Sequence, residues 1–154
     1  MVKHLKLWVV VADGEHARVL APREDGELLT QERLDSKSAH LRSSDLGSDQ
    51  PGRVHESATV ALHANQPRTD PHDAAKERFA KDLGAWLLQS SRQGAFDELV
   101  LVAPSHILTD LRESLDNQAS EKLRGALAKD LTKVPDHELQ PHLAEWVLPA
   151  RRVQ

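Results

Sequence analysis

Apolar and polar positions divide the chain into two unlike parts, and the first is a series of short apolar runs separated by Asp-Gly pairs. The runs predict strands over residues 5–12, 17–21 and 28–34. Asp13-Gly14 and Asp25-Gly26 fall between them, and Asp-Gly suits the positive φ of a tight hairpin turn. The first third therefore predicts a β-meander. Its first run is nearly continuous, as expected of a strand buried on both faces.

After residue 70 the apolar positions recur at helical spacing. Asp70 and Pro71 are residue types favoured at a helix start, and Gly94 is a plausible stop. The pattern therefore predicts one long helix between them. The apolar residues expected on its inner face are Ala75, Phe79, Leu83, Trp86 and Leu87.

The remaining sequence alternates between strand and helix signals. Residues 96–103 predict a buried strand, and Pro104-Ser105 opens a second helix with Ile107, Leu108, Leu111 and Leu115 facing inward. Residues 122–131 are interpreted as a strand, because a β-α-β return fits the preceding elements; a helix is the alternative. A last helix follows Pro135-Asp136, kinked or delayed by Pro141. Its expected buried residues are Leu139, Leu143, Trp146 and Val147.

These elements predict an α/β fold: a single domain over residues 1–154, with a β-meander followed by alternating helices and strands in a mixed sheet. At 154 residues the chain has room for one substantial core. The exception is the stretch 35–69, a long loop in which only residues 54–62 resemble a short strand. A connection of this length inside one domain is uncommon and usually functional.

Composition narrows the chemistry. The chain has no cysteine, which excludes disulfides, thiolate nucleophiles and Cys-based zinc sites. Aromatic residues make up only 3%, which argues against a base-stacking platform for single strands. The net charge is -4, and residues 33–78 hold seven Lys and Arg against seven Asp and Glu. Tight, sequence-independent nucleic-acid binding is disfavoured, and no DNA partner is expected.

No segment approaches the about 18 apolar residues of a membrane helix. The amino-terminal apolar run is short and lacks a small-residue cleavage site, so it is interpreted as a strand rather than a signal peptide. A cytoplasmic protein without a membrane partner is expected.

The histidines and serines do not form a recognisable catalytic pattern. His55, His63 and His72 lie near Asp70 and Asp73, but no His-x-x-x-His pair occurs, and the two aspartates suit helix capping. No metal site and no cofactor are therefore predicted. The Gly-x-Ser-x-Gly elbow and the glycine-rich phosphate loops are also absent, which argues against nucleotide sites of the common kinds. No catalytic residue is predicted.

The segment 45–53 is the candidate binding site. Glycines allow backbone shapes closed to other residues, and the polar side chains supply acceptors, an amide and a bidentate donor. The alternative is a structural loop in which Arg53 pairs with Asp45 or Asp49. The candidate residues are Asp45, Gly47, Asp49, Gln50, Gly52, Arg53 and, just beyond the segment, His55.

Several strings resemble the bacterial host-attachment protein family, which is named for a role in attachment to a host. The most specific are Asp45-Leu46-Gly47-Ser48-Asp49-Gln50-Pro51-Gly52-Arg53 and Lys129-Asp130-Leu131-Thr132. Further matching strings are Asp70-Pro71-His72, Lys76-Glu77-Arg78-Phe79-Ala80 and Phe96-Asp97-Glu98-Leu99-Val100-Leu101-Val102-Ala103-Pro104.

The family also resembles the middle domain of class-one peptide release factors of archaea and eukaryotes. In those factors a Gly-Gly-Gln loop before a long helix enters the ribosome, and residues 45–53 lie in a comparable place. Val11-Ala12-Asp13-Gly14 is similar to the early hairpin of that domain. Here Gln50 is flanked by Asp49 and Pro51, so peptidyl-tRNA hydrolysis is not expected.

The resemblance implies a non-catalytic, release-factor-like module that associates with the ribosome or with RNA through the 45–53 loop. Two alternatives stay open. One is a small hydrolase that uses the carboxylates of Asp45 and Asp49 together with a histidine such as His55. The other is a cytosolic protein-interaction factor that acts indirectly in host attachment.

Overall fold

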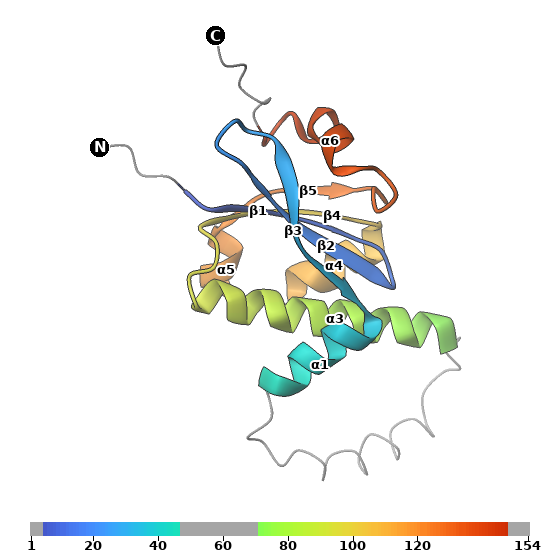
Figure 1. The fold of residues 1–154 in the computed structure, drawn as a ribbon. Helices are drawn as coiled ribbons and strands as arrows, with labels where there is room; N and C mark the ends of the chain where they lie inside the picture. Colours follow the sequence, from blue (N-terminus) through green and yellow to red (C-terminus); the bar gives the residue numbers. More distant parts are fainter. Residues whose placement is uncertain (1–4, 47–70, 148–154) are drawn as a thin grey trace.

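A computed structural model describes residues 5–46 and 71–147, and these form one mixed sheet covered by helices (Figure 1). The sheet of the described residues has five strands in the order β3-β2-β1-β4-β5. The strands are β1 Leu7–Ala12, β2 His16–Pro22, β3 Leu28–Asp35, β4 Glu98–Ala103 and β5 Leu123–Ala128. The predicted α/β class and the mixed sheet are confirmed.

The β-meander is confirmed, because β1, β2 and β3 pair antiparallel in sequence order. Its two Asp-Gly turns differ from each other. Gly26 has the expected positive φ of 91°, whereas Gly14 does not adopt a positive φ. At the first turn the Asp13 carboxylate shapes the backbone, since its Oδ1 accepts the amides of Glu15 at 2.7 Å and His16 at 2.6 Å.

β4 and β5 run parallel to β1, with Leu7 opposite Glu98 and Leu99 opposite Leu123. The strand interpretation of residues 122–131 is therefore confirmed over 123–128. A parallel pair needs a crossover connection, and two helices supply it between β4 and β5. These are α4 Ser105–Glu113, which was predicted, and the short α5 Asn117–Glu121, which was not.

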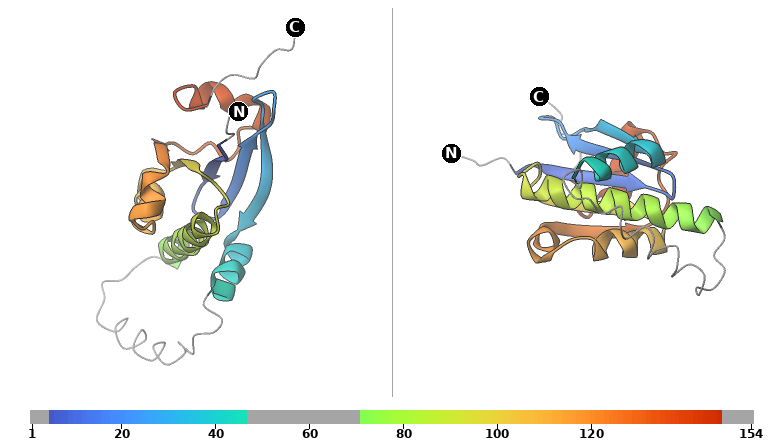
Figure 2. Two further views of the ribbon diagram at one scale, coloured as in Figure 1. Left: turned by 90° about the vertical axis from the view of Figure 1, so that its left-hand side faces the viewer. Right: turned by 90° about the horizontal axis from the view of Figure 1, so that it is seen from below.

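One face of the sheet is covered by helices, among which α3 Pro71–Arg92 is the longest (Figures 1 and 2). Phe79, Leu83 and Leu87 of α3 are buried as expected, but Ala75 is exposed and borders a hollow between α1 and α3. The helix stops at Gly94, whose φ is 73°. The amide of Gly94 donates to Ser91 and that of Ala95 to Ser90, the hydrogen-bond pattern of a Schellman motif.

The expectation of an irregular loop from residue 35 is wrong at its beginning, where α1 spans Ser36–Leu46. Asp35 and Ser38 cap this helix reciprocally. The Ser38 amide donates to Asp35 Oδ1, and the Asp35 amide donates to Ser38 Oγ, both at 2.8 Å. Ala39 is fully buried where α1 packs on α3. Local capping and tertiary packing form this helix without an apolar stripe.

The opposite face of the sheet is covered by the segment after β5. It holds two short helices, α6 Asp136–Leu139 and the 3-10 helix η1 Gln140–Leu143, instead of the single helix that was predicted. Pro141 lies at the amino end of η1, which explains why α6 ends where it does. Leu139, Leu143 and Val147 are buried as expected, and Trp146 is half-buried.

A buried ion pair ties this segment to the meander. Arg18 of β2 is 6% exposed, and its Nη1 lies 2.7 Å from Asp136 Oδ1. Arg18 Nη2 donates to the carbonyls of Leu131 and Val134, while Nε lacks a partner among the described residues. Asp136 also accepts the Thr30 amide and hydroxyl of β3. We call these residues the Arg18–Asp136 cluster.

Within residues 5–46 and 71–147, no helix is both long enough and apolar enough to cross a bilayer.

Candidate functional site

The predicted binding segment lies largely outside the described residues. Asp45 belongs to the last turn of α1. Gly47, Asp49, Gln50, Gly52, Arg53 and His55 lie in the undescribed stretch 47–70. The prediction that they form a binding site therefore stays a prediction.

The described residues form a different site, at the carboxyl edge of the sheet. β1, β4 and β5 are parallel, so their carboxyl ends lie at one edge. β1 and β4 are neighbours in the sheet, and the chain continues from β1 to β2 on one side of this pair and from β4 to β5 on the other side. In α/β sheets, ligands commonly bind beyond the carboxyl ends of two such neighbouring strands. A cleft of about 260 Å³ lies there, lined by Asp13, Gly14, Glu15, Lys76, Pro104, His106, Ile107 and Asp130. We call it the carboxyl-edge cleft.

Two carboxylates of the cleft are joined through Thr132. Asp130 follows β5, and its Oδ1 lies 2.5 Å from Thr132 Oγ1 and 3.0 Å from the Thr132 amide nitrogen. Thr132 Oγ1 also lies 3.3 Å from Asp13 Oδ2. The Thr132 hydroxyl therefore sits between the strand ends of β1 and β5.

These hydrogen bonds have an electrostatic consequence. The hydrogen bond from the Thr132 hydroxyl is the main cause that lowers the pKa of Asp130, against a smaller opposing effect of burial. Asp130 is therefore ionised at neutral pH, and the cleft carries a fixed negative charge on this side.

Two helices bring basic side chains to the same cleft. Lys76 comes from α3. His106 comes from the first turn of α4, which begins directly after Pro104, the residue that follows β4. The stem of Lys76 lies directly against the first hairpin, where a Cβ added to Gly14 would be 2.4 Å from Lys76 Cγ. Gly14 is therefore required by a close approach and not by its backbone conformation.

The cleft combines acceptors and donors, which suits binding of a ligand with both kinds of group. Within the two described ranges, no three His, Asp or Glu side chains are grouped so that they could hold a metal ion. From the sequence, Asp13 was predicted to belong to a hairpin turn and Pro104 to a helix start, while Lys76 and Asp130 belong to strings that resemble the family; none of the four was predicted as a site residue. A usable signal existed, because Asp13 and Pro104 directly follow the end of an apolar strand and Asp130 follows the end of β5 after one further residue.

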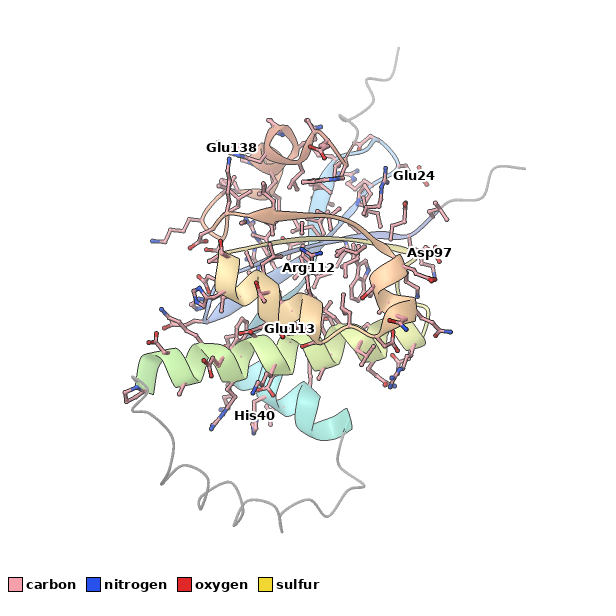
Figure 3. All side chains as sticks on the ribbon, turned by 180° about the vertical axis from the view of Figure 1, so that it is seen from behind. Glu24, His40, Asp97, Arg112, Glu113 and Glu138 are labelled. Carbon is pink, nitrogen blue, oxygen red and sulfur yellow. The ribbon has the colours of Figure 1, made fainter. Side chains whose placement is uncertain are left out.

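A second hollow lies between α1 and α3. It has a volume of about 360 Å³ and is lined by Ser36, Lys37, His40, Ala75, Arg78, Phe79 and Asp82. We call it the α1–α3 groove. His40 Nδ1 lies 3.4 Å from Asp82 Oδ2, and Figure 3 shows His40 on the side of α3 that faces away from the sheet. The groove thus presents Lys37, His40 and Arg78 near the amino end of α3.

Comparison with known proteins finds a matching family and distantly similar solved structures. The family model "Protein required for attachment to host cells" matches residues 8–143. No curated protein matches the sequence. Among solved structures, one described as "Archaeal protein" has 12% identity and a TM-score of 0.43, over 93% of this chain and 34% of that one. This chain therefore spans about a third of that protein.

The family match covers every strand and helix described above from Trp8 of β1 to Leu143 of η1, including the three strand ends at the carboxyl-edge cleft and the whole α1–α3 groove. The chain belongs to the host-attachment family, whose members are described as proteins required for attachment to host cells.

Proposed function

We propose that this host-attachment family protein is a non-catalytic, release-factor-like module, and that it associates with the ribosome or another RNA-containing partner through residues 45–53. The observation that carries the proposal is the α1–α3 groove. Residues 47–70 connect α1 to α3, and the groove gathers cations beside the amino end of α3.

The cations of the groove favour phosphate as the contacted group. Lys37 and Arg78 carry permanent positive charge, and His40 adds a third when it is protonated. Asp82 offsets part of this charge, since it lies within 3.4 Å of His40. The groove therefore supplies a small number of phosphate contacts, and the segment 45–53 supplies the remaining recognition through Gln50 and Arg53.

The net charge of -4 limits the strength of such binding. Three phosphate contacts to single-stranded RNA give a slope of about -2 in log affinity against log salt. Association is therefore expected to be moderate and to weaken visibly when the salt concentration is raised.

Co-sedimentation with ribosomes from native cells tests the proposal. Arg53→Ala and Gln50→Ala should each reduce the ribosome-bound fraction, and Lys37→Gln with Arg78→Gln should reduce it further and flatten the salt dependence. Arg112→Gln is the matched control, because it removes one exposed positive charge from α4, away from the groove (Figure 3). The proposal is refuted if the wild-type protein does not co-sediment with ribosomes. It is also refuted if Arg112→Gln reduces the ribosome-bound fraction as much as Arg53→Ala and Gln50→Ala do.

A further inference from the structure

Four separate parts of the chain converge on the carboxyl-edge cleft. They are Asp13-Gly14 after β1, Lys76 of α3, Pro104 after β4, and Asp130 with Thr132 after β5. Lys76 and Asp130 are 54 positions apart in the sequence, and both line one cleft of about 260 Å³. This convergence is independent of the α1–α3 groove and of any RNA partner.

The charges of the cleft come from different layers of the molecule. Lys76 and His106 belong to α3 and α4, which cover one face of the sheet. Asp130 belongs to the connection that leads from β5 to the opposite face, where Leu131 is buried. Asp13 is joined to Asp130 through Thr132. The cleft therefore has a basic helical side and an acidic side at the strand ends, to which Glu15 of the first hairpin adds a third carboxylate.

This polarity restricts the ligand. A simple inorganic anion would meet the carboxylates of Asp13 and Asp130, and a simple cation would meet Lys76. A ligand with a negative group for Lys76 and His106, and with hydroxyl donors for the carboxylates, satisfies both sides. In dinucleotide-binding α/β folds, for example, a carboxylate accepts a hydrogen bond from a ribose hydroxyl.

We propose that the carboxyl-edge cleft binds a small phosphorylated sugar, with the phosphate at Lys76 and His106 and the hydroxyls at Asp13 and Asp130. The cleft volume of about 260 Å³ lies just below the range of roughly 300–1,000 Å³ for drug-sized ligands, which suits a molecule as small as a single sugar phosphate. The glycine-rich phosphate loops absent from the sequence are not needed, because side chains contribute the phosphate contacts. A free sugar phosphate and the sugar phosphate part of a mononucleotide share this chemistry.

Titration of the full chain with ribose 5-phosphate, followed by calorimetry and by amide NMR shifts, tests the site. Saturable binding is expected, with the largest shifts at Gly14, His106 and Asp130. Ribose and inorganic phosphate should each bind at least tenfold more weakly, since each lacks one half of the contacts. Adenosine 5′-monophosphate separates the two sources: tighter binding indicates a mononucleotide, and equal or weaker binding indicates a free sugar phosphate.

Variants connect the binding to the cleft. Lys76→Gln and Asp130→Asn should each weaken ribose 5-phosphate about tenfold, the effect of losing one charge-assisted hydrogen bond. Gly14→Ala should weaken it similarly while leaving every charge in place, because the new Cβ displaces the Lys76 stem. Lys81→Gln, on the exposed surface of α3, is the matched control and should leave affinity unchanged.

The proposal is overturned if no saturable binding of ribose 5-phosphate occurs at millimolar concentration in the folded wild-type chain. It is also overturned if inorganic phosphate competes equally well, or if Lys76→Gln and Asp130→Asn, with unchanged thermal unfolding, bind as the wild type does. Ribosome association of the same variants is measured in parallel. If the protein does not associate with ribosomes but binds ribose 5-phosphate as described, only the proposed ribosome association is refuted.

Discussion

Two places in the molecule join the meander to the segment after β5 by means of charged side chains. In the Arg18–Asp136 cluster a guanidinium that is 6% exposed meets a carboxylate, and two backbone carbonyls accept its remaining hydrogen bonds. In the carboxyl-edge cleft, Asp13 and Asp130 meet through Thr132, and Asp130 is exposed. Both sites link the same two parts of the chain, but only the first holds a buried charge: the Arg18 side chain is 7% exposed and that of Asp136 is 23% exposed.

The difference in burial predicts a difference in role. A buried charge that loses its partner is costly, because neither water nor another group replaces the lost interaction. An exposed carboxylate that loses a neighbour is solvated instead. The Arg18–Asp136 cluster should therefore determine stability, while the cleft can be altered at little cost in stability and remains available to a ligand. Four changes test this contrast.

Asp136→Ala should have the largest effect. It leaves Arg18 buried without its carboxylate and removes the acceptor of the Thr30 amide, so the free energy of unfolding should fall by about 3 kcal/mol. Urea unfolding followed by circular dichroism measures this. The double variant Arg18→Met with Asp136→Ala should be more stable than expected from adding the losses of the two single variants, because the buried charge is removed together with its partner. If the loss of the double variant equals that sum, the two residues are not directly coupled.

Thr132→Val should have a smaller effect, a loss of about 1 kcal/mol, because Asp130 loses one hydrogen bond but stays accessible to water. The same change should raise the pKa of Asp130 toward its usual range, since the Thr132 hydroxyl is the main cause of its lowering. Carboxyl NMR titration measures the pKa. An unchanged Asp130 pKa in this variant would show that the hydroxyl does not stabilise the carboxylate.

Low pH should reduce the stabilisation that the Arg18–Asp136 cluster gives to the fold. Burial opposes ionisation of Asp136, but the hydrogen bonds from Thr30 and the charge of Arg18 outweigh it and lower the pKa of Asp136 below its ordinary value. A lowered folded-state pKa gives a stabilisation that is full above the unfolded pKa and is lost as the pH falls through the folded one. Stability measured by urea from pH 5 downward should fall. Asp136→Asn should show a shallower decline than wild type, and an equal slope would assign the acid sensitivity to other carboxylates.

Lys76→Gln should have the smallest effect on stability, within about 0.5 kcal/mol of the wild type, because the amine is at the surface and only its stem packs on the hairpin. Thermal unfolding measures this. A loss as large as that of Asp136→Ala would place Lys76 among the stabilising residues and remove the contrast between the two sites.

Patterns that are local in sequence predicted most of the fold. The strands β1 to β4, the long helix α3 and its stop at Gly94 follow from apolar runs and from residue types suited to turns and caps. The helix α1 was missed because its sequence has no apolar stripe to recognise; among the side chains of residues 36–42, Ala39 is the buried one. The signal that was present is the pair Asp35 and Ser38, which caps the helix reciprocally.

The carboxyl-edge cleft could not be predicted from spacing alone. Asp13, Lys76, His106 and Asp130 come together only through the pairing of β1 with β4 and of β4 with β5. Sequence reasoning could identify each as the residue after a strand or on a helix, but the strand order was needed to bring them to one edge. The predicted segment 45–53 was favoured because its residue types are concentrated locally.

The pairing of β1 with β4 also has a consequence for the time course of folding. Leu7 lies opposite Glu98, so this contact closes a loop of about ninety residues, whereas β1, β2 and β3 are joined by short turns. Local pairs form before distant ones. During synthesis on the ribosome the meander can therefore assemble early, while the second edge of β1 stays open until β4 has emerged. A chain stopped before residue 98 would expose that edge to pairing with other chains.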